Sequence, residues 1–294
     1  MVLPGTTLEG FTVTPMTSLA SLEVDLEAAR SRLQALASRA AALVAGAGDL
    51  STPVPRLGWT VGQTAAHLVV ALRAYTDAIN GNLDRWRPYL PETPHYQERL
   101  SAVNERTIAD QPSDDAADLS AGIEEAARAF LAASGTHDAD DTVPTPWYEP
   151  GAQLSLRAAT CLLLGEQLIH GHDIAITLRR PWRIGDDDAR LAVHATIAMM
   201  PIILKREAIG KEFAYGIRLR GGPHFVVRNT GASLTVAPAL GQKVDCWVAG
   251  SAETYIMIGY GRLNQWHAIA RGRLFAWGRK PWLALKLVDL FHRP

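Results

Sequence analysis

The hydrophobic pattern of the chain changes its period near residue 182, and this change limits the folds open to it. Between residues 18 and 44, leucine and alanine recur at alternating intervals of three and four, which places them on one side of an α-helix. After Pro181 the pattern shortens to alternation in runs such as 213–220 and 224–229, separated by glycine and proline, as in antiparallel strands. The sequence therefore predicts two domains, an antiparallel helical bundle followed by an α+β domain.

Further helices are expected in the first part. One begins at Thr60, where Gln63 three residues later completes the pattern of a capping box. Other helical patterns cover residues 95–110, 114–134 and 154–178. The acidic, proline-rich segment 138–152 is expected to be a long loop, of a length that often carries function.

The composition is that of a soluble globular protein, with 48% hydrophobic and 20% charged residues, but its charge is unevenly distributed. Residues 1–186 hold 14 Lys and Arg against 23 Asp and Glu, a net charge of −9, and residues 187–294 hold 15 against 7, a net charge of +8. The two domains could dock through opposite charges, or the basic one could attract an anionic ligand. Unrelated solvated surfaces would give the same counts.

Several classes of protein are disfavoured. No window reaches the roughly 18 apolar residues of a membrane span, and the sequence predicts no secretory signal. Cys161 and Cys246 form no motif, which favours a reduced, cytoplasmic protein. A glycine-rich phosphate loop, a serine-centred elbow and a CxxC pair are all missing from the sequence. The basic residues of the second domain are scattered, so we expect neither a nucleic-acid nor a membrane partner.

The stretch LLLGEQLIHGHDIAITL, residues 162–178, places ionisable side chains inside an apolar run, where each is costly to bury unless it is paired or bound. At about 100° per residue, Glu166, His170 and Asp173 share one stripe of the helix, whereas His172 lies on the other side. His67 stands among small residues on another helix of the bundle. Two histidines and a carboxylate suit zinc or a similar divalent ion, with coordination positions left open.

The same residues also fit a structural interpretation. A Glu-x-x-x-His pair on a helix often forms only an ion pair, and a lone histidine in a bundle is often a hydrogen-bonded core residue. The residues alone leave both interpretations open.

The segments LGWTVGQTAAHL and GEQLIHGHDIA resemble the mycothiol-dependent maleylpyruvate isomerase family, which belongs to the DinB-like metal-binding four-helix bundles. The resemblance implies such a bundle over residues 15–182. It implies that a divalent metal, usually zinc, is bound by His67, Glu166 and His170. Asp173 matches an acidic residue close to the site, and Trp59 and Gly171 match positions that look structural.

The second domain, residues 183–294, is similar through residues 245–291 to the sterol-carrier-protein-like module that is often fused to these bundles, an α+β fold with a mostly antiparallel sheet. In the isomerase an arginine of this domain contributes to the active site, and Arg262 is its best counterpart here. The alternative is that Arg262 only caps or pairs locally.

The resemblance implies an enzyme that uses mycothiol, a low-molecular-weight thiol, on a small-molecule substrate. A metal-held thiolate can add to an activated double bond, as in the cis–trans isomerisation of maleylpyruvate, and without the elimination the reaction becomes thiol transfer. Asp173 could accept or orient a proton, and Arg262 could hold a substrate carboxylate. A lipid or small-molecule carrier with a structural metal is the alternative outside enzymes. Monomer and dimer both remain open.

Overall fold

A computed structural model describes residues 7–8, 11–13, 24–93, 95–112 and 114–293 of the chain. It divides into two compact units, residues 24–191 and residues 192–294 together with 1–23. Helix α6 (Asp186–Ile203) runs across the division between the units. The domain limits inferred from the sequence, 15–182 and 183–294, remain a prediction.

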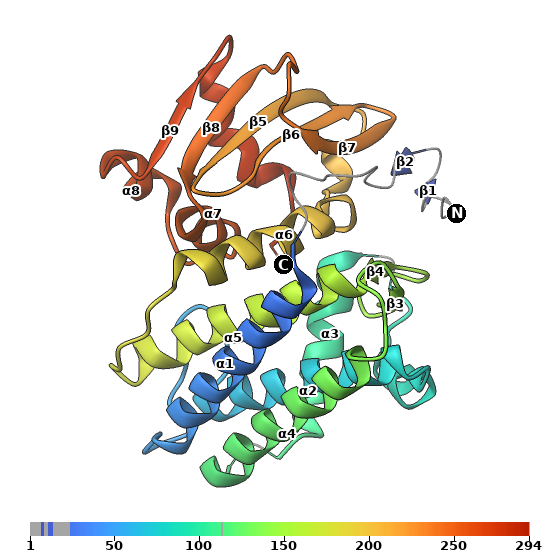
Figure 1. Cartoon of the computed structure of the whole chain (residues 1–294), viewed down its shortest axis with the longest axis vertical. Helices are drawn as coiled ribbons and strands as arrows, with labels where there is room; N and C mark the ends of the chain where they lie inside the picture. Colours follow the sequence, from blue (N-terminus) through green and yellow to red (C-terminus); the bar gives the residue numbers. More distant parts are fainter. Residues whose placement is uncertain (1–6, 9–10, 14–23, 94, 113, 294) are drawn as a thin grey trace. The chain divides into compact units, whose positions relative to one another are not determined.

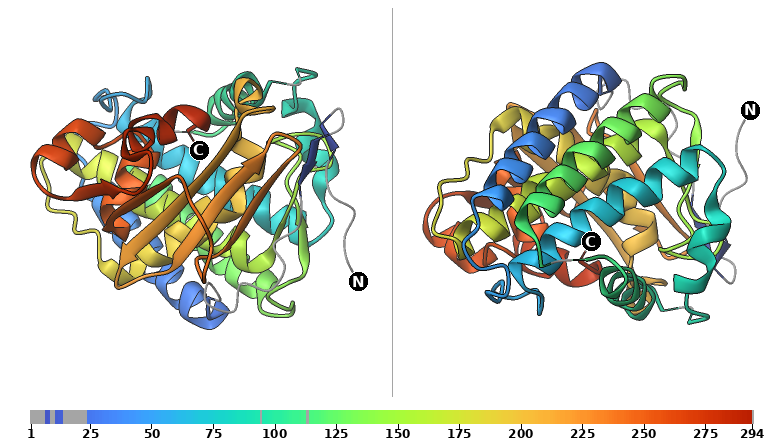
Figure 2. Two further views of the ribbon diagram at one scale, coloured as in Figure 1. Left: turned by 90° about the horizontal axis from the view of Figure 1, so that it is seen from above. Right: turned by 90° about the horizontal axis from the view of Figure 1, so that it is seen from below.

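The first unit is a bundle of four long helices (Figure 1). These are α1 (Leu26–Ala45), α2 (Val61–Ile79), α4 (Ala116–Ser134) and α5 (Leu156–Thr177). Helix α4 lies between α1 and α2 and packs on both (Figure 2, right). Helix α5 packs on the same two helices, so the four close into a bundle. The predicted helical bundle is confirmed.

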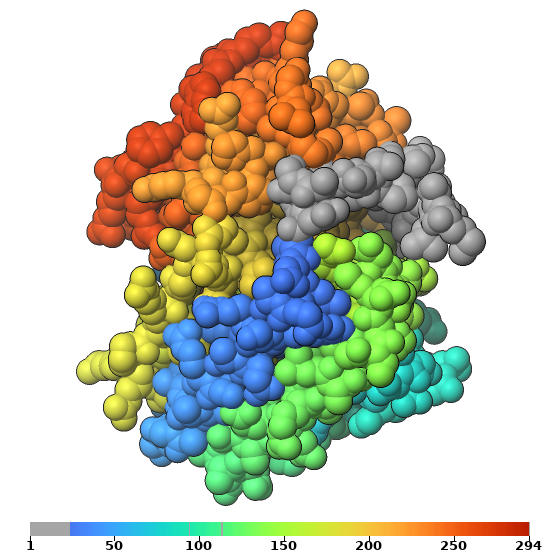
Figure 3. All heavy atoms as spheres, viewed as in Figure 1, coloured from blue at the N-terminus to red at the C-terminus, as the bar shows by residue number. Residues whose placement is uncertain are grey.

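Local sequence explains where these helices begin and which faces they bury. Asp25 caps α1 by accepting a hydrogen bond from the Glu27 amide, and the apolar seam of this helix is buried, with Leu33 and Leu36 at its centre. Thr60 and Gln63 form the predicted capping box of α2. The alanines on the buried faces let the helices approach closely, and α1 (blue) lies against α4 (green) on the face shown in Figure 3.

The connections of the bundle contain more structure than the sequence indicates. The 3₁₀-helix η2 (Leu83–Tyr89) follows α2 and was not predicted, whereas helix α3 (Tyr96–Ala109) confirms the helix expected over residues 95–110. The predicted loop 138–152 is not irregular throughout, because β3 (Thr142–Pro144) pairs antiparallel with β4 (Gln153–Ser155). These strands have three residues each, too few to show an alternating pattern.

The second unit is built on a mixed sheet. Among the described residues its strands are β1 (Thr7–Leu8), β2 (Phe11–Val13), β5 (Glu212–Arg220), β6 (His224–Thr230), β7 (Ser233–Pro238), β8 (Cys246–Ser251) and β9 (Leu274–Trp277). They lie in the order β1-β2-β7-β6-β5-β8-β9 (Figure 2, left). The pairs β2–β7 and β5–β8 are parallel and the others antiparallel, so the expected mostly antiparallel sheet is confirmed.

One face of this sheet forms the core of the second unit. Tyr215, Ile217 and Phe225 are buried there, and the Tyr215 hydroxyl donates to the Leu283 carbonyl at 3.0 Å. Leu283 belongs to η4 (Pro281–Leu290), a 3₁₀-helix that begins with a proline.

The short helices α7 (Ala252–Gly259) and α8 (Gln265–Ala270) and the 3₁₀ turn η3 (Arg206–Ala208) complete the second unit. Of all the helices described, none combines the length and the apolar character needed to span a membrane.

Candidate metal centre

Helices α2 and α5 bring together the side chains of His67, Glu166 and His170. Oε2 of Glu166 lies 3.0 Å from Nε2 of His67 and 3.2 Å from Nε2 of His170. One ligand atom from each of the three residues lies within 4.8 Å of the others. His67 and His170 are only 8% and 7% exposed. The group is therefore a compact buried cluster of nitrogen and oxygen donors.

Asp173 holds the other nitrogen of His170. Its Oδ2 lies 3.2 Å from Nδ1 of His170, one turn further along α5, and its side chain is buried. A carboxylate at Nδ1 fixes the ring orientation and turns Nε2 toward Glu166, as outer carboxylates do for histidines that bind metals. His172 is half-buried and does not belong to the group of His67, Glu166 and His170. The contacts of Asp173 thus support a positioning role, and its predicted catalytic role remains a prediction.

Gly171 allows α5 to keep this position. A Cβ atom at residue 171 would lie 2.2 Å from the ring of Trp182, so no larger residue fits without movement. The Trp182 indole donates to the Leu168 carbonyl at 3.0 Å, and the guanidinium of Arg39 lies 4.2 Å from its ring centre. The packing of Trp182 on α5 explains Gly171 as a structural residue.

Trp59 belongs to the surroundings of the cluster, although the sequence suggested only a structural role for it. Its ring centre lies 5.0 Å from that of His67 and 6.1 Å from that of His170. Trp59 immediately precedes the capping residue of α2, so the start of this helix fixes the indole beside the two imidazoles. The position of Trp59 next to the capping residue can be seen in the sequence, but its contact with His170 on α5 joins segments far apart in the chain.

A group of aromatic side chains lies further along α2. The Tyr75 hydroxyl is 3.1 Å from the Tyr148 hydroxyl, and the ring of Trp147 meets that of Tyr75 edge-on at 4.9 Å. Burial raises the pKa of Tyr75, and the negative charge of Glu166 raises it further. Sequence reasoning did not identify these phenols, because residues 147 and 148 come from the connection between β3 and β4.

Burial and pairing act in opposite directions on the pKa values of the cluster. Burial lowers the pKa of His67 below its usual value and favours a neutral imidazole. Burial also acts against the charge of His170, but bonds to Asp173 and Glu166 outweigh it and raise its pKa to about 9. For Glu166, burial raises the pKa, and the hydrogen bonds from His170 and His67 overcome this and hold the pKa well below its usual range. The cluster thus offers an ionised carboxylate beside a neutral imidazole.

These donors fit a divalent metal ion. Two ligands held about 2 Å from a tetrahedral ion lie about 3.3 Å apart, close to the distances between Glu166 and each imidazole. Nδ1 of His67 is buried, and none of the described groups forms a hydrogen bond with it. Imidazole nitrogen and carboxylate oxygen together are typical of zinc, iron and related ions.

The remaining candidates lie elsewhere. Arg262 belongs to the second unit and follows α7, where its Nη1 donates to the Tyr260 carbonyl at 2.5 Å. Its predicted role toward a substrate remains a prediction. Cys161 and Cys246 are both free and buried, and burial raises the pKa of the Cys161 thiol to about 12. The pKa of Cys246 is also raised by burial, so neither protein thiol is prepared to act as a nucleophile.

Comparison with known proteins relates this bundle to a family. Residues 33–175 match the model of the mycothiol maleylpyruvate isomerase N-terminal domain. The match covers just under half of the chain and most of its helical unit, and this unit belongs to the domain family. No curated protein sequence matches the chain.

One solved structure extends the likeness to the fold of most of the chain. A mutant of the mycothiol-dependent maleylpyruvate isomerase superposes with a TM-score of 0.52 at 14% identity, over 85% of this chain and 94% of that one. A second crystal structure of the mycothiol-dependent maleylpyruvate isomerase gives a TM-score of 0.46 at 15% identity, over 84% and 93% of the two chains. At these identities the first comparison shows a shared fold. The similarity of the second unit to a sterol-carrier module remains a prediction.

Proposed function

We propose that the chain is a metal-dependent enzyme that uses a low-molecular-weight thiol, mycothiol, to isomerise an activated cis alkene such as maleylpyruvate. The convergence of His67, Glu166 and His170 from two helices, in a unit of the maleylpyruvate isomerase family, carries this proposal. In it these three side chains hold a divalent metal, with zinc as the first candidate. When bound, the metal would keep the incoming thiol deprotonated near neutral pH and so supply the nucleophile for reversible addition to the alkene.

Neither cysteine of the chain offers a competing thiol nucleophile. Cys161 lies on α5, but it is fully buried and burial raises the pKa of its thiol. Cys246 is buried in the second unit. A thiol-dependent reaction at this cluster therefore needs a thiol from outside, which favours a thiol cosubstrate over a cysteine enzyme.

The residues around the cluster would orient and shield the reacting groups. Asp173 fixes the ring of His170, so the donor nitrogen keeps its direction. Trp59 covers one side of the two imidazoles with an apolar surface, which limits access of water. Three protein ligands leave at least one coordination position open, where the sulfur of the thiol could bind. A structural metal ion is usually held by four protein ligands, so this set favours a catalytic role.

Arg262 is proposed to bind the substrate, through a bidentate contact between its guanidinium and a substrate carboxylate. The basic character of residues 187–294 supports this role, because an anionic substrate is attracted by the local charge. The proposal for the metal and the thiol stands without this contact.

Titration calorimetry tests the proposal directly. The full chain, loaded with zinc, is titrated with mycothiol, and the same protein after treatment with a chelator serves as the reference. We expect mycothiol to bind only to the metal-loaded protein and glutathione to bind more weakly. Equal binding of mycothiol with and without metal would refute the assigned role of the cluster.

Product analysis then separates the reactions. Incubation with maleylpyruvate, mycothiol and the metal-loaded protein should give the trans isomer and return the thiol unchanged. A stable thiol adduct in place of the isomer would identify a thiol transferase and overturn the isomerase assignment. Retention of full activity after complete removal of the metal would contradict both.

A further inference from the structure

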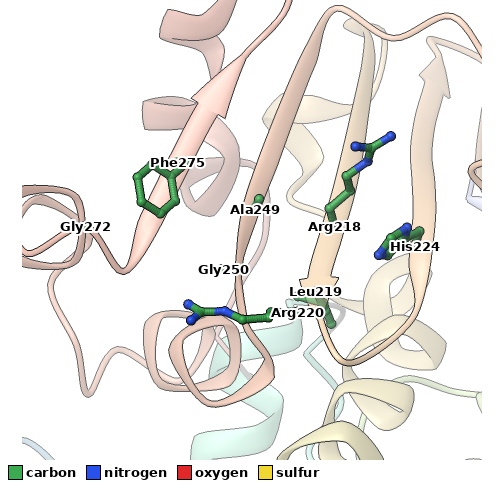
Figure 4. Close-up of a pocket in the computed structure, with 8 residues that line it drawn as sticks. All are labelled: Arg218, Leu219, Arg220, His224, Ala249, Gly250, Gly272 and Phe275. Atoms are coloured by element: carbon green, nitrogen blue, oxygen red, sulfur yellow. The ribbon is translucent and has the colours of Figure 1, made fainter.

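A pocket opens on the face of the second unit's sheet that lies opposite to Tyr215 and Phe225, here called the outer face. It has a volume of about 350 Å³, and Arg218, Arg220, His224 and Phe275 are among the residues that line it (Figure 4). None of these residues belongs to the cluster of His67, Glu166 and His170. The volume lies in the range of small-molecule sites.

Strand register brings the side chains of this pocket into one row. Phe275 on β9 is opposite Ala249 on β8, Ala249 is opposite Arg218 on β5, and Arg218 is opposite His224 on β6. Opposed residues project from the same face of a sheet, so an aromatic ring, a methyl group, a guanidinium and an imidazole stand side by side. Strands lie about 4.8 Å apart, which places Phe275 and Arg218 about 10 Å apart across the small side chain of Ala249.

The adjacent row forms a shelf of two indoles. Trp277 is opposite Trp247, which is opposite Gly216, and the two rings stack at 6.1 Å with an angle of 13°. The ring of Trp247 lies over Gly216, so closely that a Cβ atom at residue 216 would come within 2.3 Å of it. Glycine at position 216 therefore creates the place for the indole.

The indole shelf holds Arg218 in position. Its guanidinium carbon lies 4.8 Å from the ring centre of Trp247 and 5.7 Å from that of Trp277. Cation–π contacts of this kind stabilise a guanidinium without using its N–H donors. The donors of Arg218 are therefore available to a ligand.

The positive charge of the pocket has no counter-charge among the described residues. Two other arginines of the unit are paired, Arg273 with Glu253 at 3.2 Å and Arg279 with Asp245 at 2.5 Å. Arg218 and Arg220 form no such ion pair with a described carboxylate, although both are exposed. Phe275, in the same pocket, is 55% exposed. Unpaired guanidinium groups beside exposed aromatic surface indicate a ligand that carries both a negative charge and an apolar ring.

We propose that this pocket binds a small aromatic carboxylate, with the carboxylate on Arg218 and Arg220 and the ring over Ala249 against Phe275. Guanidinium groups pair with a planar carboxylate through two parallel hydrogen bonds, and the exposed ring of Phe275 gains contact area when an aromatic ring covers it. A single-stranded nucleic acid also uses arginine and aromatic groups, but it needs a groove that follows several nucleotides. The pocket spans one row of side chains and suits one ring. This inference goes beyond the proposed function and uses none of its residues.

A titration of the full chain with 2-naphthoate, followed by NMR, tests this site. The indole N–H signals of Trp247 and Trp277, assigned with the W247F and W277F variants, report on the shelf directly. We expect these two signals to shift and saturate with 2-naphthoate. The uncharged analogue 2-naphthamide should bind at least about tenfold more weakly, since it lacks the charge that the guanidinium groups recognise.

Three variants locate the binding groups. Arg218→Gln and Arg220→Gln should each weaken 2-naphthoate binding by about tenfold, and Phe275→Ala should weaken it by severalfold. Arg279→Gln is the matched control, because it removes an exposed guanidinium of the same unit that is paired with Asp245 and does not line the pocket. Circular dichroism checks that each variant is folded.

Two results would overturn the inference. The first is binding of 2-naphthoate by the Arg218→Gln and Arg220→Gln variants with the affinity of the unmodified chain. The second is binding of a thymidine oligonucleotide that shifts the same indole signals more strongly than 2-naphthoate does, which would identify a nucleic-acid surface instead.

Discussion

The cluster on α2 and α5 and the pocket on the outer face use similar groups in opposite environments. In the cluster the imidazoles of His67 and His170 are nearly inaccessible, and the contacts of Glu166 and Asp173 with them are 3.2 Å or shorter. In the pocket Arg218 rests on aromatic rings and has no described carboxylate as a partner. Burial makes an unpaired charge costly, whereas an exposed guanidinium keeps its hydration. The buried cluster is therefore organised before any ligand arrives, and the exposed pocket suits reversible recognition of an anion.

The two regions also differ in how the chain encodes them. Glu166, His170 and Asp173 lie within two turns of one helix, so their proximity follows from helix geometry. Phe275, Ala249 and Arg218 meet only because three strands pair in one register. A substitution in the cluster should therefore act through one or two helices, whereas a substitution in the pocket can act through the packing and register of three strands.

The largest effect is expected from removing an imidazole of the cluster. His67→Ala and His170→Ala each leave two of the three donors, and we expect the bound divalent metal, about one per chain, to fall by at least about tenfold. Elemental analysis of the purified variants measures this. His137→Ala is the control, because His137 pairs with Asp141 on the surface of the same unit. Unchanged metal content in both variants would show that His67 and His170 are not metal ligands.

A smaller effect is expected from Asp173→Asn, which keeps the shape of the side chain but weakens its hold on Nδ1 of His170. Loss of such an outer carboxylate lowers metal affinity by about 10–100-fold. Competition with a chelator of known affinity measures the change. A complete loss of metal would indicate that Asp173 is itself a ligand, and no change would remove its positioning role.

The sequence best predicts those features of the molecule that depend on near neighbours in the chain. The capping box of Thr60 and Gln63 and the stripe of Glu166 and His170 depend on neighbours three or four residues away. The contact of Trp59 with His170 joins distant segments and left no periodic signal.

The strands β3 and β4 were missed for another reason, since segments of three residues are too short for alternation to appear. The pocket on the outer face could not be predicted, because Arg218 and Phe275 are brought together by β8, which lies between them in the sheet. The role proposed for Arg262 comes from the family resemblance alone, and its hydrogen bond to the Tyr260 carbonyl does not decide that role.

The substitution Gly216→Ala tests whether the pocket on the outer face can be disturbed without an effect on the cluster. The added methyl group meets the ring of Trp247 and should displace it, because the half-exposed indole can move outward. We expect a destabilisation of about 1–2 kcal/mol, measured by urea unfolding, together with weaker binding of 2-naphthoate. Gly259→Ala is the control in the same unit, because a Cβ there has no neighbour within 4 Å. Metal content should stay the same, and a loss of metal would show that the shelf and the cluster are coupled.

The smallest effect is expected from Thr60→Ala, which tests whether the local encoding of the cluster extends to the start of α2. The Thr60 hydroxyl accepts from the Gln63 amide at 3.2 Å, and this bond is lost, whereas the backbone amide of residue 60 can still donate to the Gln63 side chain. Loss of a capping hydroxyl destabilises a helix by about 0.5–1 kcal/mol, and Thr60→Ser should restore most of it. Urea unfolding measures the difference. His67 lies nearly two turns inside α2, so metal affinity should change by less than about twofold. A loss as large as that of Asp173→Asn would mean that the first turn, with Trp59 beside it, holds the imidazole in place.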